Sequence, residues 1–140
     1  MHGLIVALVL LAFTPMRVLG AGEASQDCCE TGSPFVLGEG FAELPATCET
    51  AGYWAARAPD LEARVTMTVD GPLTGVHTDG ILAYLVMCEP DDVQVLCVTY
   101  STEGRSVGEV VQLAGGYTGV DNGMVILDPC LASPSQDPPT

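Results

Sequence analysis

The chain has 140 residues, with 18 Asp and Glu against four Lys and Arg, so its formal net charge is −14. Such a surface repels nucleic-acid phosphates and anionic lipid head groups, which excludes nucleic acid as an expected partner. The length predicts one domain.

An uninterrupted apolar run, LIVALVLLAF, occupies residues 4–13. It is too short to cross a bilayer, which needs roughly 20 residues, but it is typical of a secretory signal. Small residues between positions 20 and 24 favour cleavage there. We therefore predict a signal peptide over 1–22 and an exported protein, periplasmic or extracellular, with no membrane segment after cleavage. An uncleaved signal anchor is the alternative, because no Lys or Arg precedes the apolar run.

Residues 23–60 are expected to form a lead-in pinned by disulfides and ending in one short helix. The stretch 25–46 is irregular and interrupted by Gly and Pro, whereas 47–58, TCETAGYWAARA, is rich in Ala. Pro59 ends that helix because it disfavours the helical conformation of the residue before it. Trp54 is expected to cover one end of the core.

Five strands are predicted between residues 61 and 131, over 63–76, 81–88, 93–100, 109–118 and 124–127. Turns rich in Gly, Pro, Asp and Asn separate them. Gly71-Pro72 and Gly115-Gly116 are expected to bend the first and fourth strands. Residues 132–140 are polar and rich in Pro, which predicts a disordered tail.

Bent strands and one short N-terminal helix predict an all-β protein built on a five-stranded OB-type barrel, because closure removes exposed strand edges. An immunoglobulin-like sandwich would need about seven strands. A six-stranded barrel or a meander is the alternative.

The segment 49–130 resembles the tRNA-anti-like OB-fold domains of exported bacterial proteins. The residues that carry this resemblance are Val65, Val69 and Gly71 in the first strand, Cys97 in the third, Gly108, Glu109, Val111, Gly115 and Gly116 in the fourth, and Val125, Ile126, Leu127 and Cys130 at the end. The resemblance implies the fold and no catalytic residues. The chain also resembles, more weakly, a netrin-like OB domain, because it is expected to be secreted and has cysteines near both ends.

All cysteines lie beyond the predicted signal, at Cys28, Cys29, Cys48, Cys88, Cys97 and Cys130. An even number in an exported chain predicts disulfides. Cys97 and Cys130 are expected to pair, since the third and fifth strands of an OB barrel are neighbours. Cys28 and Cys29 either bond to each other as a redox pair or bond to separate partners. A zinc site on these two and Cys48 is disfavoured without a C-x-x-C pair, so no metal or cofactor is expected.

OB-type barrels present ligands on strands two and three and on adjoining loops. Those elements hold five candidate ligand-binding residues, Tyr84, Tyr100, His77, Asp79 and Asn122. A platform for nucleic-acid bases also needs a basic groove, and Arg105 is the one cation nearby in the sequence. The alternative is that both tyrosines are ordinary strand residues of the core or rim.

Strands two and three carry apolar residues on both faces, whereas a half-solvated sheet should alternate. One expected face holds Ala83, Leu85, Met87, Leu96 and Val98, and the other holds Tyr84, Val86, Cys88, Val93, Val95 and Cys97. We expect the lead-in and the helix around Trp54 to lie across the outer face, held by a disulfide. The rival hypothesis is a dimer or partner interface on the same patch.

No catalytic residues are predicted, because His77 has neither a second histidine in the mature chain nor a serine nucleophile motif beside it. We expect a non-catalytic binding or structural module whose partner is an unknown protein, a small uncharged solute or a saccharide. A small secreted hydrolase or redox enzyme is one alternative, and an oligonucleotide- or saccharide-binding OB domain is another.

The intact mass of the exported protein tests the signal peptide. Cleavage predicts a mass that begins between residues 20 and 24, because the small residues of a signal cleavage site lie there. A mass that begins at Met1 would contradict cleavage.

Overall fold

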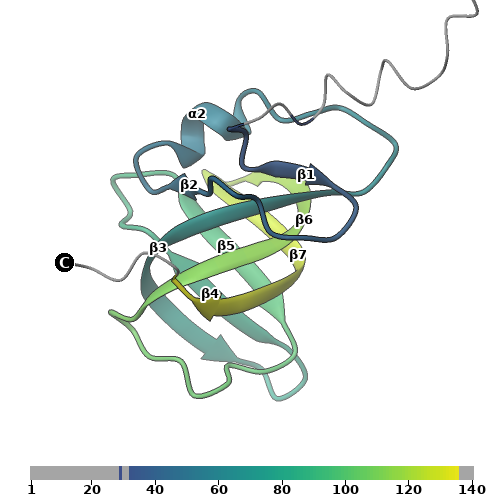
Figure 1. Ribbon diagram of the computed structural model, residues 1–140. Coiled ribbons are helices and arrows are strands. Elements are labelled where there is room, and N and C mark those ends of the chain that lie inside the picture. The colour runs from purple at the N-terminus through teal and green to yellow at the C-terminus, as the bar shows by residue number, and fades with distance from the viewer. Residues whose placement is uncertain (1–28, 30–31, 136–140) are drawn as a thin grey trace, which may run out of the picture.

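A computed structural model describes Cys29 and residues 32–135, so the predicted signal peptide, Cys28 and residues 136–140 lie outside the described residues. In chain order the elements are β1 (Phe35–Leu37), β2 (Ala46–Thr47), α2 (Ala51–Ala55), β3 (Val65–Thr78), β4 (Ala83–Met87), β5 (Gln94–Thr99), β6 (Val110–Asp121) and β7 (Met124–Pro134) (Figure 1). Within this part of the chain, no helix is long and apolar enough to cross a membrane.

Five strands close into a barrel in the order β3, β4, β5, β7, β6, because β6 returns to pair with β3. The β5–β7 pair is parallel, and the other four pairs of the barrel are antiparallel. This order confirms the predicted all-β class, with a closed OB-type barrel and one short helix. The strands β1 and β2 are additional and lie beside β3.

Barrel closure depends on β3, which changes partner at its predicted bend. Residues Thr66 to Pro72 pair with β6, and Leu73 to Thr78 pair with β4. A register shift follows between Leu73 and Gly75, so the strand is irregular where it turns the corner. The predicted Gly71-Pro72 bend lies directly before this irregularity, at the point where the pairing with β6 ends.

The last strand is longer than the sequence predicts. We expected it to end at Leu127 and a disordered tail to begin at residue 132, but β7 continues to Pro134 along β6. Pro129 is accommodated because the register shifts there, with Leu127 paired to Tyr117 and Cys130 paired to Gly115. A proline placed at such an irregularity removes no hydrogen bond from the ladder.

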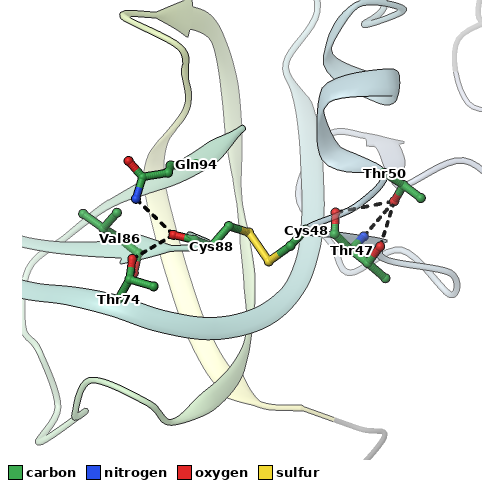
Figure 2. The surroundings of a disulfide bond; sticks show 7 residues. All are labelled: Thr47, Cys48, Thr50, Thr74, Val86, Cys88 and Gln94. Atoms are coloured by element: carbon green, nitrogen blue, oxygen red, sulfur yellow. Dashed lines mark hydrogen bonds between the residues drawn. A yellow bond between two sulfur atoms is a disulfide. The ribbon is translucent and has the colours of Figure 1, made fainter. Parts of the chain in front are cut away.

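Two disulfides join distant parts of the chain. Cys97 and Cys130 are bonded inside the core, 2% exposed or less, which confirms the predicted pair. Cys48 and Cys88 bond the lead-in to the end of β4 (Figure 2). Cys29 is also disulfide-bonded, while the pairing of Cys28 lies outside the described residues. Such bonds are typical of proteins that fold in an oxidising compartment.

The chain around Cys88 is fixed by side-chain hydrogen bonds. Its carbonyl oxygen accepts from Oγ1 of Thr74 at 2.9 Å and from Nε2 of Gln94 at 3.0 Å (Figure 2). Cys88 itself has a φ of 77°, a conformation unusual for a residue other than glycine. The two side chains therefore hold the turn in the position that the disulfide with Cys48 requires.

The lead-in lies along β3 and over its outer face, which corrects the expectation that it crosses strands two and three. β1 pairs with residues 65–67, and β2 pairs with Val69 and Asp70. Thr66 donates to the carbonyl of Gly38, and Thr68 accepts from the backbone N–H of Ala42. These outward threonines supply the hydrogen bonds that an irregular backbone needs when it is buried, whereas the outer side chains of β4 and β5 are largely apolar.

The helix α2 is shorter than the predicted 47–58 and covers one end of the barrel. Ala51 is fully buried, and Trp54 packs against the core, as expected. A Cβ on Gly52 would lie 2.9 Å from Cγ2 of Val93, so this glycine permits the close approach of helix and turn. Tyr117 reaches the helix from β6 and donates to the carbonyl of Ala55 at 3.4 Å.

Replacing Gly115 by Ala tests the close contact between β6 and β7. The new Cβ would lie 2.7 Å from the carbonyl oxygen of Pro129, so we expect a loss of about 1–3 kcal/mol in the free energy of unfolding. Gly40→Ala is the matched control, because its Cβ would meet its nearest neighbour at an ordinary 3.8 Å. Denaturant unfolding measures both, and equal stabilities would contradict the strand contact.

Candidate functional site

Three of the five predicted ligand residues come together at the β3–β4 corner. His77 lies directly across from Tyr84 in the antiparallel register. The hydroxyl of Tyr84 donates to Oδ2 of Asp79 at 3.0 Å. These three residues therefore lie together on the outer face of the barrel.

Asp79 is held as a carboxylate by the turn in which it lies. Its Oδ1 accepts from the backbone N–H groups of Leu82 at 2.7 Å and Ile81 at 2.9 Å. These bonds, with that from Tyr84, lower the pKa of Asp79 below its ordinary value, the bond from Leu82 most strongly. The same carboxylate raises the pKa of Tyr84 by accepting its hydrogen bond. Asp79 thus fixes the turn and orients the tyrosine.

Asn122 is separate from this corner. Asn122 lies in the β6–β7 turn with a φ of 51°, beside Met124, which pairs with the first residue of β5. The β3–β4 corner adjoins the other end of β5, where Thr99 pairs with Ala83. Five residues of extended strand separate the two ends by about 17 Å. Asn122 is accounted for by its turn, since asparagine tolerates a positive φ.

The register corrects the predicted faces of strands two and three. Tyr84 lies across from Val98, and Val86 lies across from Leu96. Leu96 and Val98 therefore share the outer face with Tyr84 and Val86, while Val95 and Cys97 face the core. The sequence assignment was displaced by one residue in strand three, and such a slip moves every side chain to the opposite face.

A partly exposed apolar surface follows from this register. We call it the outer strip and define it as Tyr84, Val86, Leu96, Val98 and Ile126. The central row of the strip crosses four strands. Gly75 on β3 lies beside Val86 on β4, and Leu96 on β5 lies beside Ile126 on β7. The side chains that alternate with these are fully buried, including Leu85, Val95 and Val125. Solvent therefore reaches the strip from outside while the core lies beneath it.

Tyr100 lines a different hollow, between the lead-in and β7. We call it the seam groove and define its walls as Phe41, Arg64, Tyr100 and Leu131; its volume is about 210 Å³. Three of these side chains are exposed, Phe41 by 47%, Leu131 by 64% and Tyr100 by 80%. Sequence reasoning selected Tyr100 but missed the other three, because they come from segments that only the tertiary structure joins.

The described residues provide no assembled metal or thiol chemistry. Among Cys29 and residues 32–135, no three His, Cys, Asp or Glu side chains come together in a way that could hold a metal ion. No cysteine of this part of the chain is free.

No protein-family model matches the chain, and no curated protein matches it either. The closed five-stranded barrel is compatible with an OB-like fold.

Asp79→Asn tests the coupling between this carboxylate and Tyr84. We expect the phenol pKa of Tyr84 to fall toward its ordinary value, because the carboxylate that accepts the hydrogen bond of the phenol, and whose charge also favours the protonated form, is removed. A pH titration of the tyrosine Cζ resonance by ¹³C NMR measures it. Asp121→Asn removes the same charge at the opposite end of β5 and should leave this pKa unchanged; equal effects would contradict a direct contact.

Proposed function

We propose that this protein is an exported, non-catalytic binding module that holds a partner protein on the outer strip. One observation carries the proposal: the lead-in covers the outer face of β3 and leaves the apolar outer side chains of β4 and β5 in contact with solvent. Contiguous exposed apolar surface is typical of interaction sites. The disulfides and the apolar run at the start of the sequence support export.

The side-chain chemistry of the strip favours a protein partner over a sugar. Its centre is aliphatic, formed by Val86, Leu96, Val98 and Ile126, which suits the apolar core of a protein interface. Its one aromatic ring, Tyr84, already donates its hydroxyl hydrogen bond to Asp79. A saccharide or base site relies more on free aromatic faces and on polar groups that still need partners.

The negative charge of the protein limits which partner proteins can bind the outer strip. Exposed carboxylates border the strip, among them Asp79 at one end and Asp121 at the other. The formal charge of −14 opposes association with a second copy, with nucleic acid and with acidic proteins. The partner best suited to this surface has an apolar patch bordered by neutral or basic residues.

Kinship with the tRNA-anti-like OB-fold domains is part of the proposal. The order of the motifs supports it, as do the helix before the first barrel strand and the pairing of Cys97 with Cys130. That kinship implies a barrel that displays ligands on its surface and carries over no catalytic residue.

The variant Leu96→Lys tests the outer strip. It places a positive charge at the centre of the strip, so we expect binding of a basic partner to weaken at least tenfold, or about 1.4 kcal/mol. Val110→Lys adds the same charge to an exposed valine of β6 outside the strip. Partners retained by the wild-type protein from the exported fraction of its source cells are identified, and their affinities are measured by calorimetry.

Each outcome of this comparison has a clear meaning. A partner lost by Leu96→Lys and kept by Val110→Lys supports the proposal. Equal affinity for both variants would place the interface elsewhere. Retention of single-stranded DNA at low salt, or saturable binding of a neutral oligosaccharide at the strip with no protein retained, would overturn it.

A further inference from the structure

We propose that the seam groove is a binding site for a small amphipathic carboxylate, with an apolar body of about one ring and an acid group that pairs with Arg64. The site is distinct from the outer strip, and the inference does not rest on the function proposed above.

The groove concentrates exposed apolar side chains from three separate segments. Phe41 comes from the lead-in, Tyr100 follows β5, and Leu131 lies on β7. A single exposed apolar residue on a protein surface needs no explanation. Here three of them converge on one hollow, whose remaining wall includes the backbone around Gly115 and Pro129. Burial of a ring or a short alkyl chain among them is favourable because it removes apolar area from water.

Arg64 is the one cation of this groove and is weakly engaged. Within the described part of the chain, its ion-pair partner is Glu39, at 3.7 Å, and the two side chains are 41% and 82% exposed. That distance is longer than a hydrogen bond, and such exposed pairs contribute little. The guanidinium is nevertheless placed over the backbone of β6, since a Cβ on Gly116 would lie 3.5 Å from its Nη2.

The other two described arginines are committed to partners of their own. Arg105 pairs with Glu109 at 2.8 Å and donates to the carbonyl of Ala132. Arg57 lies 3.7 Å from the ring centre of Tyr53 and donates to the carbonyl of that residue. Arg64 is therefore the described arginine whose guanidinium is most available to a ligand.

The chemistry of the groove selects a monovalent acid with a compact apolar body. A guanidinium binds a carboxylate through two parallel hydrogen bonds. A cavity of about 150 Å³ holds benzene, so the groove, at about 210 Å³, suits one ring or a short alkyl chain. Glu39, which also lines the groove, and the net charge of −14 disfavour anions in proportion to their charge, so a single charge is better accommodated than several.

NMR titration with 3-phenylpropionate tests the site on the ¹⁵N-labelled protein. We expect saturable shifts at the Nε–H of Arg64 and the backbone of Tyr100 and Leu131, with a Kd on the order of 1 mM. The uncharged 3-phenylpropan-1-ol should bind at least about fivefold more weakly, because it cannot form the charged pair. Equal affinity for acid and alcohol, or shifts confined to the outer strip, would overturn the proposal.

Two variants separate the local contact from the long-range field. Arg64→Gln should weaken 3-phenylpropionate at least about fivefold, since it removes the guanidinium. Arg57→Gln removes the same charge elsewhere and should leave the Kd unchanged. An equal loss of affinity in both variants would show that only the net charge of the protein matters, and it would overturn the site. Leu131→Gln removes apolar contact from a side chain that is 64% exposed, so the fold should be retained while binding weakens.

Discussion

The partner exchange of β3 is the constraint on which the rest of the structure depends. Its first half pairs with β6 and its second half with β4, and the two pairings meet at Pro72 and Leu73, where the carbonyl of Pro72 accepts from Cys88 and Leu73 donates to the carbonyl of Glu109. Without its pairing to β3, β6 would remain an open edge, which invites pairing with other chains. The exchange converts a sheet into a barrel and also decides which faces of the strands look outward.

The distribution of polar side chains on the outer face decides where the lead-in lies. The first half of β3 presents Thr66 and Thr68 outward, and their hydroxyls satisfy the irregular backbone that covers them. The outer side chains of β4 and β5 are largely apolar and offer no comparable partners. Burying a loop there would leave its N–H and C=O groups unsatisfied. The outer strip thus stays uncovered because it offers too few hydrogen-bond partners to a buried backbone.

The same arrangement separates two surfaces of different chemistry. The outer strip is aliphatic and bordered by carboxylates, of which Asp79 is fixed by its own turn. The seam groove forms between the part of the lead-in around Phe41 and β7, and it combines aromatic walls with the guanidinium of Arg64. Neither surface is created by one segment alone, and a chain that folded without its lead-in would lack the wall that Phe41 provides.

The sequence by itself determined the class of fold, because turn residues and strand propensity are local properties. Gly71-Pro72 predicted the bend of β3, and neighbouring strands in the expected barrel predicted the bond between Cys97 and Cys130. Only the tertiary structure decided the outward face of Leu96, since a turn longer or shorter by one residue reverses the alternation. It also decided the path of the lead-in and the meeting of Phe41, Arg64 and Leu131, because contacts between distant segments depend on the geometry of the closed barrel.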